Sequence, residues 1–164
     1  HLSIRRQRQM CIRDRGYVTG GVMRAFVVGF AVYIVTTLFT SIPIANVGLV
    51  ILLTFLTAFL FSIAGFINAV YAKSFDDINI VTTFVLTPLT YLGGTFYSIA
   101  SLPQVWQDIS VFNPIVYIIS SYRLAFLGVE ETSLVLSLSV IISLIIILFI
   151  TALMLLSRGT GIKN

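Results

Sequence analysis

The sequence predicts an all-α, polytopic helical membrane protein with four transmembrane helices and two short re-entrant helices on the outer side. Its 164 residues are 58% hydrophobic and 10% charged, whereas soluble domains carry roughly 45–50% apolar and about 25% charged residues. The chain contains three uncharged stretches of 48, 30 and 26 residues, at 25–72, 78–107 and 132–157. Since about 20 helical residues cross a bilayer core, the first stretch is long enough for two spans and each of the others for one. This composition leaves too little polar surface for a water-soluble enzyme, and it also excludes a disordered chain.

The first fifteen residues differ from the rest of the chain. They contain five arginines against Asp14, while residues 16–164 have five basic and five acidic side chains. A basic surface that binds nucleic acid is spread over a folded face, so no nucleic-acid partner is expected here. Residues 1–15 are either a cytoplasmic segment held at anionic lipid headgroups or a non-native stretch that looks like translated sequencing-adapter read-through. We favour the second interpretation, in which case the chain is a C-terminal fragment.

Charged residues mark the ends of the predicted spans within a single domain of residues 16–164. Lipid offers backbone groups no hydrogen-bond partners, so the spans must be helical. The first two are joined by a turn around Pro43, and the last begins after Glu131. The four spans lie at about residues 22–41, 48–72, 78–98 and 133–156.

Four spans place both ends of the chain on the same side of the membrane. Lys and Arg favour the cytoplasmic side. Beyond residue 15, the side of the two ends would hold Arg24, Lys73, Arg158 and Lys163, and the opposite side would hold only Arg123. Both ends are therefore predicted to be cytoplasmic, and residues 99–131 are predicted to lie outside.

Small side chains form a stripe along the second span, at steps of three and four residues that keep them on one helix face. Such faces let helices approach closely in lipid, so the stripe packs either against another span or against a second protomer. Residues Gly16–Gly20 also have the glycine spacing of a helix-dimer motif. Because they lie at the start of the first span, we expect a loop or a helix beginning there. The stripe consists of Ala58, Ser62, Gly65, Ala69 and Ala72.

A short polar connection, the knuckle, joins the second and third spans. Ser74 can cap the next helix, with Asp77 completing a capping box, and acidic residues are favourable at a helix N-terminus. Two interpretations stay open: a capped, solvated turn, or a rigid acidic segment that docks on a soluble cytoplasmic partner, with Phe75 fitting a socket. The knuckle consists of Lys73, Ser74, Phe75, Asp76 and Asp77.

The third span contains helix-disturbing residues. Pro88 removes a backbone hydrogen bond and predicts a kink, and the pair Gly93 and Gly94 loosens the helix further. The kink belongs either to a static bend or to a moving gate helix.

The outer segment predicts two short helices, because its longest uncharged run is interrupted at Asn113 and Pro114. Asn113 is an N-cap with Pro114 in the first helical turn, Gly128 is a helix end, and Ser101 with Gln104 has capping-box spacing. Half-depth helices are tolerated only where protein or a water-filled cavity surrounds them, which is typical of a transport path.

Side chains of this outer segment suit the membrane surface. Trp106 and Tyr117 fit the membrane–water interface, as does Tyr122. Arg123 is expected either to extend outward or to pair with an acidic neighbour, the candidates being Asp108, Glu130 and Glu131.

Motifs for chemistry are absent from the sequence. There is no Walker phosphate loop, no GxGxxG fingerprint and no HExxH, the patterns that mark nucleotide and zinc sites. One His and one Cys cannot build a multi-ligand metal site or a disulfide framework. We therefore expect no enzyme activity, no metal and no cofactor in this chain.

The chain resembles the permease subunit of ABC-2 type transporters, in the YadH/NodJ-like group. The resemblance runs from about Gly16 to the C-terminus and rests on the blocks Ala72–Ile78, Phe84–Ser98 and Asn113–Tyr117 followed by Arg123. The family has six spans per permease, so this chain resembles the last four, without the amino-terminal helix, the first two spans and most of the first coupling loop.

The resemblance implies an exporter in a bacterial inner (plasma) membrane. Two permeases would pair, as a homodimer or with a related permease, and two cytoplasmic ATPase subunits would bind ATP and Mg and drive them. Residues 73–77 would be the coupling loop to the ATPase, and the path would run between the protomers. The outer re-entrant helices would gate the exit, with Pro103, Trp106, Asn113, Pro114, Tyr117 and Arg123 as gate residues.

The sequence leaves the cargo and one alternative open. The absence of charge within the spans suggests an amphipathic or lipid-linked substrate in contact with membrane lipid. The alternative function is a non-transport membrane scaffold or sensor, which would stimulate no ATP hydrolysis in any partner.

Overall fold

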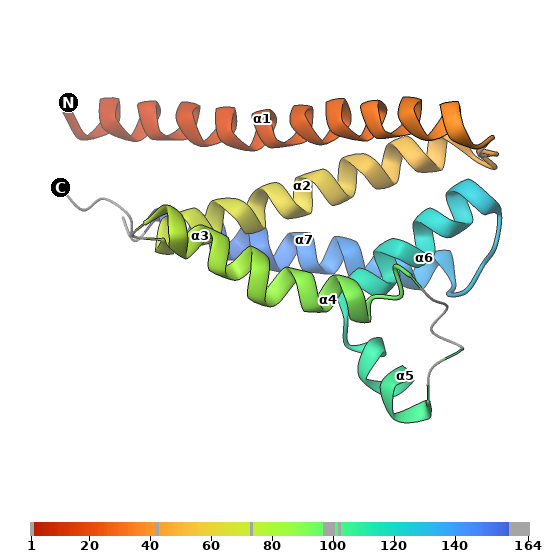
Figure 1. The fold of residues 1–164 in the computed structure, drawn as a ribbon. Coiled ribbons are helices and arrows are strands. Elements are labelled where there is room, and N and C mark those ends of the chain that lie inside the picture. Colours follow the sequence, from red (N-terminus) through yellow and green to blue (C-terminus); the bar gives the residue numbers. More distant parts are fainter. Residues whose placement is uncertain (1, 42, 73, 97–100, 102, 158–164) are drawn as a thin grey trace.

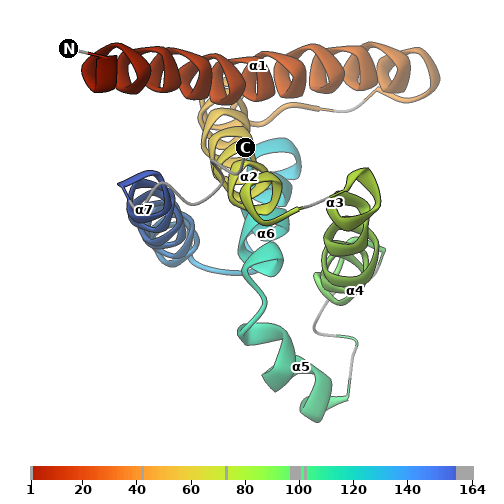
Figure 2. The same cartoon turned by 90° about the vertical axis from the view of Figure 1, so that its left-hand side faces the viewer.

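The computed structural model describes residues 2–157 except 42, 73, 97–100 and 102, with backbone only for 2–15, 17 and 75. Every described element is helical. Most of the helices run roughly side by side, the first lies across them at an angle, and one short helix projects away (Figures 1 and 2). The beginning of α1, the α2–α3 connection and the end of α7 lie at one end of the bundle (Figure 1). The end of α1, the beginning of α2, the end of α6 and the beginning of α7 lie at the other end (Figure 1).

Helix α1 (Leu2–Phe39) is longer than predicted. Its apolar part, Val18–Phe39, is long enough to cross a membrane. The expectation of a loop or helix start at Gly16–Gly20 is wrong, since the helix runs straight through these residues. The Arg, Gln and Met residues that precede them are good helix formers, so they offset the cost of two glycines, about 1 kcal/mol each.

Helix α2 (Val47–Tyr71) begins where Asn46 caps it, because the Asn46 side-chain oxygen accepts a hydrogen bond from Leu49 N at 3.1 Å. The loop before it is tied to the end of α6. Ala45 N and Asn46 N donate to the carbonyls of Phe126 and Ala125 at 3.1 and 3.0 Å. These bonds satisfy carbonyl groups that a helix end leaves open.

The predicted third span is a run of three segments, α3 (Phe75–Val81), the π-helix η1 (Thr82–Leu86) and α4 (Thr87–Leu92). The π turn stands immediately before Pro88, whose ring nitrogen cannot donate a hydrogen bond. Thr87 donates to the Thr82 carbonyl instead, from its backbone N–H and, at 3.2 Å, from its hydroxyl. The run ends at Leu92 rather than 98, because Gly93 and Gly94 form a turn.

Helices α5 (Gln104–Val111) and α6 (Pro114–Leu127) meet at an angle of 93°. Asn113 caps α6 and Gly128, at φ 70°, ends it, as predicted. The capping box expected at Ser101 and Gln104 is wrong. The N-cap of α5 is Pro103, which makes no side-chain cap bond.

Helix α7 (Leu134–Ser157) closes the described part of the chain, and α1, α2 and α7 each contain a segment that can span a membrane alone. The core lies where α2, α6 and α7 meet, at Leu53, Leu60, Ile118, Ala125 and Ile141. Viewed along α2 and α7, helix α1 lies across the bundle at its edge (Figure 2). None of the residues in its most apolar stretch is buried.

Candidate functional site

In the described part of the knuckle, Ser74 and Asp77 form a reciprocal capping box. The Ser74 hydroxyl accepts a hydrogen bond from Asp77 N at 3.3 Å, and Asp77 Oδ2 accepts one from Ser74 N at 3.1 Å. These bonds satisfy two of the N–H groups that open a helix. The capping box predicted from the sequence is therefore present.

The knuckle is also braced against α2. Asn68 Nδ2 donates to the carbonyl of Ile78 at 3.2 Å, one turn beyond the start of α3. This bond joins the end of α2 to α3 and fixes the direction in which α3 leaves the turn. Asp76 is exposed at the start of α3 and Asp77 is half-buried. Lys73 and the side chain of Phe75 lie outside the described residues.

At the opposite end of the bundle, α4 meets α6 at a glycine. A Cβ atom on Gly93 would lie 2.9 Å from Ile115 Cγ2, 3.1 Å from the Leu89 carbonyl oxygen and 3.2 Å from Ile119 Cδ1. These distances are shorter than ordinary van der Waals contacts. Gly93 is therefore required for the close approach of two helices, and the next residue, Gly94, turns the chain with φ 81°.

Asn113 joins the same two helices. Its side-chain oxygen caps α6 by accepting from Ile115 N at 3.0 Å, and its Nδ2 donates to the Leu89 carbonyl of α4 at 2.7 Å. Tyr117 reaches back across the bend and donates to the Val111 carbonyl at 2.9 Å. The predicted cap residue Asn113 therefore also ties the beginning of α6 to α4.

Arg123 makes the third connection at this end. Its guanidinium forms an ion pair with Glu131 at 2.7 Å and donates to the Gly94 carbonyl at 2.6 Å. The two charged side chains are 23% and 27% exposed. Glu131 is one of the predicted acidic partners. Through these contacts Arg123 links α6, the turn after α4 and the loop before α7. We call Gly93, Gly94, Asn113, Arg123 and Glu131 the outer junction.

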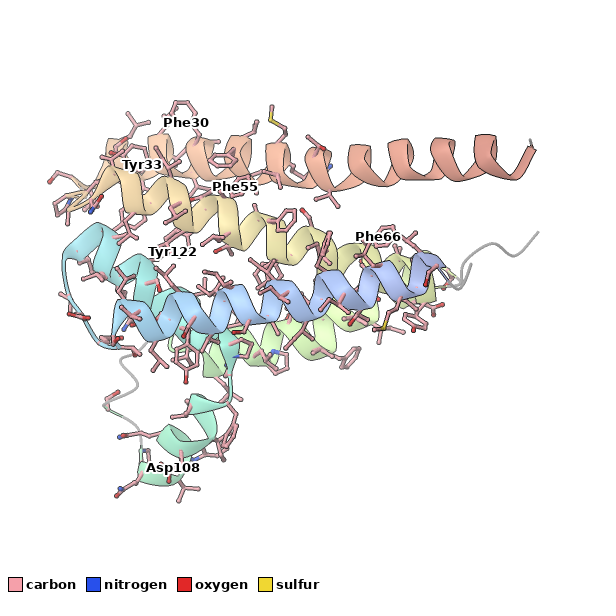
Figure 3. The ribbon with its side chains drawn as sticks, turned by 180° about the vertical axis from the view of Figure 1, so that it is seen from behind. Phe30, Tyr33, Phe55, Phe66, Asp108 and Tyr122 are labelled. Carbon is pink, nitrogen blue, oxygen red and sulfur yellow. The ribbon has the colours of Figure 1, made fainter. Side chains whose placement is uncertain are left out.

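The remaining predicted gate residues lie on or beside α5, which projects from the bundle (Figure 1). Pro103 begins this helix, and Trp106 on it is 47% exposed. Asp108 lies on α5 away from the other helices (Figure 3). Pro114 occupies the first turn of α6, as predicted. The structure therefore brings Asn113, Pro114, Tyr117 and Arg123 to the bend, and leaves Trp106 apart from them.

Comparison with known proteins identifies the family to which the chain belongs. Residues 15–127 match the family described as ABC-2 type transporter. The chain belongs to the ABC-2 type transporter family.

Relatives of this ABC-2 chain confirm the predicted resemblance. The inner membrane transport permeases YadH of Escherichia coli K12 and of Shigella flexneri are each 46% identical to it over 149 residues, which are 91% of this chain. The match covers 58% of those relatives, so the chain spans less than two thirds of their length. Nodulation protein J of Rhizobium leguminosarum bv. viciae is 28% identical over 103 residues, 63% of this chain and 40% of the relative. No solved structure gives a significant match.

Part of the small-residue stripe of the ABC-2 chain faces α1. A Cβ atom on Gly21 of α1 would overlap Ser62 Oγ on α2, so the two helices touch there. Ala58, Ser62 and Gly65 line the groove between these helices, while Ala69 and Ala72 continue the stripe toward the knuckle. The contact at Ser62 is packing within the chain, and a second protomer against this stripe stays a prediction.

Sequence reasoning missed four contacts, those of Asn68, Arg123, Asn113 and Tyr122 with partners on other segments. Asn68 was available as a signal, because an amide in an otherwise apolar span needs a partner. The Gly94 carbonyl and the Leu89 carbonyl gave no signal, since backbone acceptors look alike in a sequence. Tyr122, expected at the membrane interface, instead donates to Thr54 Oγ1 of α2 at 3.2 Å, between the two helices (Figure 3).

Proposed function

We propose that the chain is the membrane-spanning permease subunit of an ATP-driven ABC exporter. It pairs with a second permease, and a cytoplasmic ATPase that binds ATP and Mg drives it through the knuckle. The cargo is an amphipathic or lipid-linked molecule, and the membrane is a bacterial inner membrane with both ends of this chain in the cytoplasm. Membership of the ABC-2 family and the YadH relatives support the permease assignment.

One observation carries the coupling part of the proposal: a single helical run joins the knuckle to the outer junction. The run α3–η1–α4 extends from Phe75 to Leu92, about 27 Å at 1.5 Å per residue. It begins at the capping box and ends at Gly93, which is packed against α6. A partner that moves the knuckle would therefore also move the run α3–η1–α4, whose other end contacts the outer helices.

The π turn is a position at which the helical run α3–η1–α4 can bend. Short π segments occur often at functional sites, and they lack the regular hydrogen-bond ladder of the flanking helix. Here the π turn lies between the knuckle and Pro88. An ATPase that binds the knuckle differently in its two nucleotide states would bias two arrangements of the run, as any ligand-driven switch requires.

Co-purification with a co-expressed ABC ATPase subunit tests the docking role. Asp76→Lys reverses an exposed charge that takes no part in the capping box, so it should weaken ATPase binding without unfolding α3. Asp77 is unsuitable for this test, because its carboxylate completes the cap. We expect one reversed charge at an interface to lower retention of the ATPase by about tenfold.

Asp108→Lys is the matched control. It makes the same charge change on an exposed aspartate at the opposite end of the bundle, and it should leave ATPase retention unchanged. Equal retention by both variants and the parent would contradict docking at the knuckle. If the ATPase never associates, and its hydrolysis is not stimulated, a scaffold or sensor function replaces the exporter.

A further inference from the structure

A groove of about 1270 Å³ runs between α1 and α2 and is closed at one end by α6. Tyr122 and Phe126 of α6 line that end, and Tyr33 of α1 lines the same groove. The groove lies along the apolar part of α1, the segment Val18–Phe39 that can span a membrane. It is separate from the knuckle and from the outer junction.

Glycines keep the groove open rather than closing it. The two helices touch at Gly21 and Ser62, but Cβ atoms on Gly20, Gly29 or Gly65 would meet nothing within 4 Å. All three of these glycines line the groove. Small residues that interlocked with a neighbouring helix would show short contacts, so these positions leave room for a narrow apolar occupant.

One charged side chain lines the groove. Arg24 lies six residues after the start of the apolar segment, about 9 Å into it at 1.5 Å per residue. The other lining residues include no Asp or Glu, and the ion pair found in the described part of the chain is the one at Arg123, not one at Arg24. Arg24 is exposed, and the predicted topology places it toward the cytoplasmic side, where an anionic lipid headgroup attracts a basic side chain.

The lining between Arg24 and the closed end is apolar and aromatic. Phe26, Phe30 and Tyr33 contribute from α1, and Val50 and Ile51 from α2. Arg24 and Tyr33 are nine residues apart, about 14 Å along the helix, which is close to half of a ~30 Å hydrocarbon core. Arg24 followed by an apolar lining about as long as one leaflet is thick matches a lipid with an anionic headgroup and an acyl chain.

We propose that this groove is a binding site for an acidic phospholipid. Its phosphate pairs with the Arg24 guanidinium, and one acyl chain lies along the groove toward Phe30 and Tyr122. The charge of the occupant follows from an arginine with no acidic lining residue, and its apolar tail follows from the aromatic track. The site does not depend on the cargo or on the ATPase, so it can be tested apart from export.

Photolabelling in vesicles tests the site. The protein is reconstituted in phosphatidylcholine with a phosphatidylglycerol probe that carries a diazirine in its acyl chain, and the labelled residues are mapped by mass spectrometry. We expect labels on α1 between Arg24 and Tyr33 and on the facing part of α2. Unlabelled phosphatidylglycerol should compete, whereas phosphatidylcholine and inorganic phosphate should not.

Two variants test separately the binding of the lipid phosphate and the binding of the acyl chain. Arg24→Gln should lower labelling about fivefold, the effect expected for one basic residue on an acidic lipid, while Arg24→Lys should retain most of it. Gly29→Leu keeps the charge but narrows the track, and should also reduce labelling. Arg158→Gln, which removes a cation elsewhere in the chain, is the matched control and should change nothing.

Several outcomes would overturn the proposal. Equal labelling by a phosphatidylcholine probe, or no change in Arg24→Gln, would make the groove a general lipid contact. Competition by inorganic phosphate would indicate a simple anion site. Labels that avoid the groove altogether would indicate that protein, from a second copy or a longer chain, fills it. None of these outcomes affects ATPase binding at the knuckle.

Discussion

The two ends of the helical run α3–η1–α4 are built differently. At the knuckle, the turn is held by its own capping box and one amide bond from Asn68, and Asp76 is exposed. At the outer junction, a packed glycine, a buried asparagine and an ion pair tie three segments together. The knuckle is locally rigid and open to a partner, whereas the outer junction is fastened within the chain.

This difference indicates how one chain can combine a surface for a partner, at the knuckle, with a set of internal contacts that holds the outer helices in place, at the outer junction. Local hydrogen bonds such as a capping box fix the shape of a turn without using the surface that a partner needs. Contacts between distant segments, such as Arg123 with Gly94 and Glu131, must break or shift if the outer helices are to move. We therefore expect Gly93→Ala and Arg123→Ala at the outer junction to cost more stability than Ser74→Ala at the knuckle.

The largest effect is expected at Gly93. Gly93→Ala places a methyl group 2.9 Å from Ile115 Cγ2 and 3.1 Å from the Leu89 carbonyl oxygen, and such overpacking costs about 1–3 kcal/mol. Unfolding in bicelles with increasing denaturing detergent measures the loss. Gly65→Ala is the control, since its methyl group meets nothing within 4 Å. It should leave stability unchanged or raise it by about 0.5–1 kcal/mol, because alanine favours a helix over glycine. Equal effects of the two variants would refute the close approach of α4 and α6.

A smaller loss is expected when the ion pair of the outer junction is broken. Arg123→Ala removes both the Glu131 pair and the bond to the Gly94 carbonyl, and should cost about 1–2 kcal/mol. Glu131→Gln removes only the ion pair, whose side chains are about a quarter exposed, and should cost less than 1 kcal/mol. A double-mutant cycle measures the coupling between the two residues. A coupling near zero would mean that the pair does not hold the junction.

At the knuckle we expect a smaller loss than that of Arg123→Ala. Ser74→Ala removes the hydroxyl that accepts from Asp77 N and should cost about 1 kcal/mol, as is typical of a lost N-cap. Ser74→Thr keeps a hydroxyl and should be close to neutral. A loss at Ser74 larger than that at Arg123 would reverse the contrast between the two ends.

Local features could be predicted from the sequence better than contacts between segments. The capping box at Ser74 and Asp77, the cap at Asn113 and the helix end at Gly128 follow from residue types within one turn. The continuous helix through Gly16–Gly20 was missed because glycine spacing looks the same in a loop and in a helix. The Gly94 partner of Arg123 could not be predicted, since it depends on how α4 and α6 pack. Pro88 predicted a disturbance of the helix, but residue types alone do not specify that it takes the form of a π turn at Thr82–Leu86.

The measurement that tests this account most directly is the sidedness of the two ends. Single cysteines replace Asp76 and Asp108 in a Cys11→Ser background, and a membrane-impermeant maleimide is applied to right-side-out and inside-out vesicles. The account predicts that position 76 reacts only in inside-out vesicles and position 108 only in right-side-out vesicles. Labelling of position 76 from the outside of intact cells would contradict it, because no cytoplasmic ATPase could then reach the knuckle.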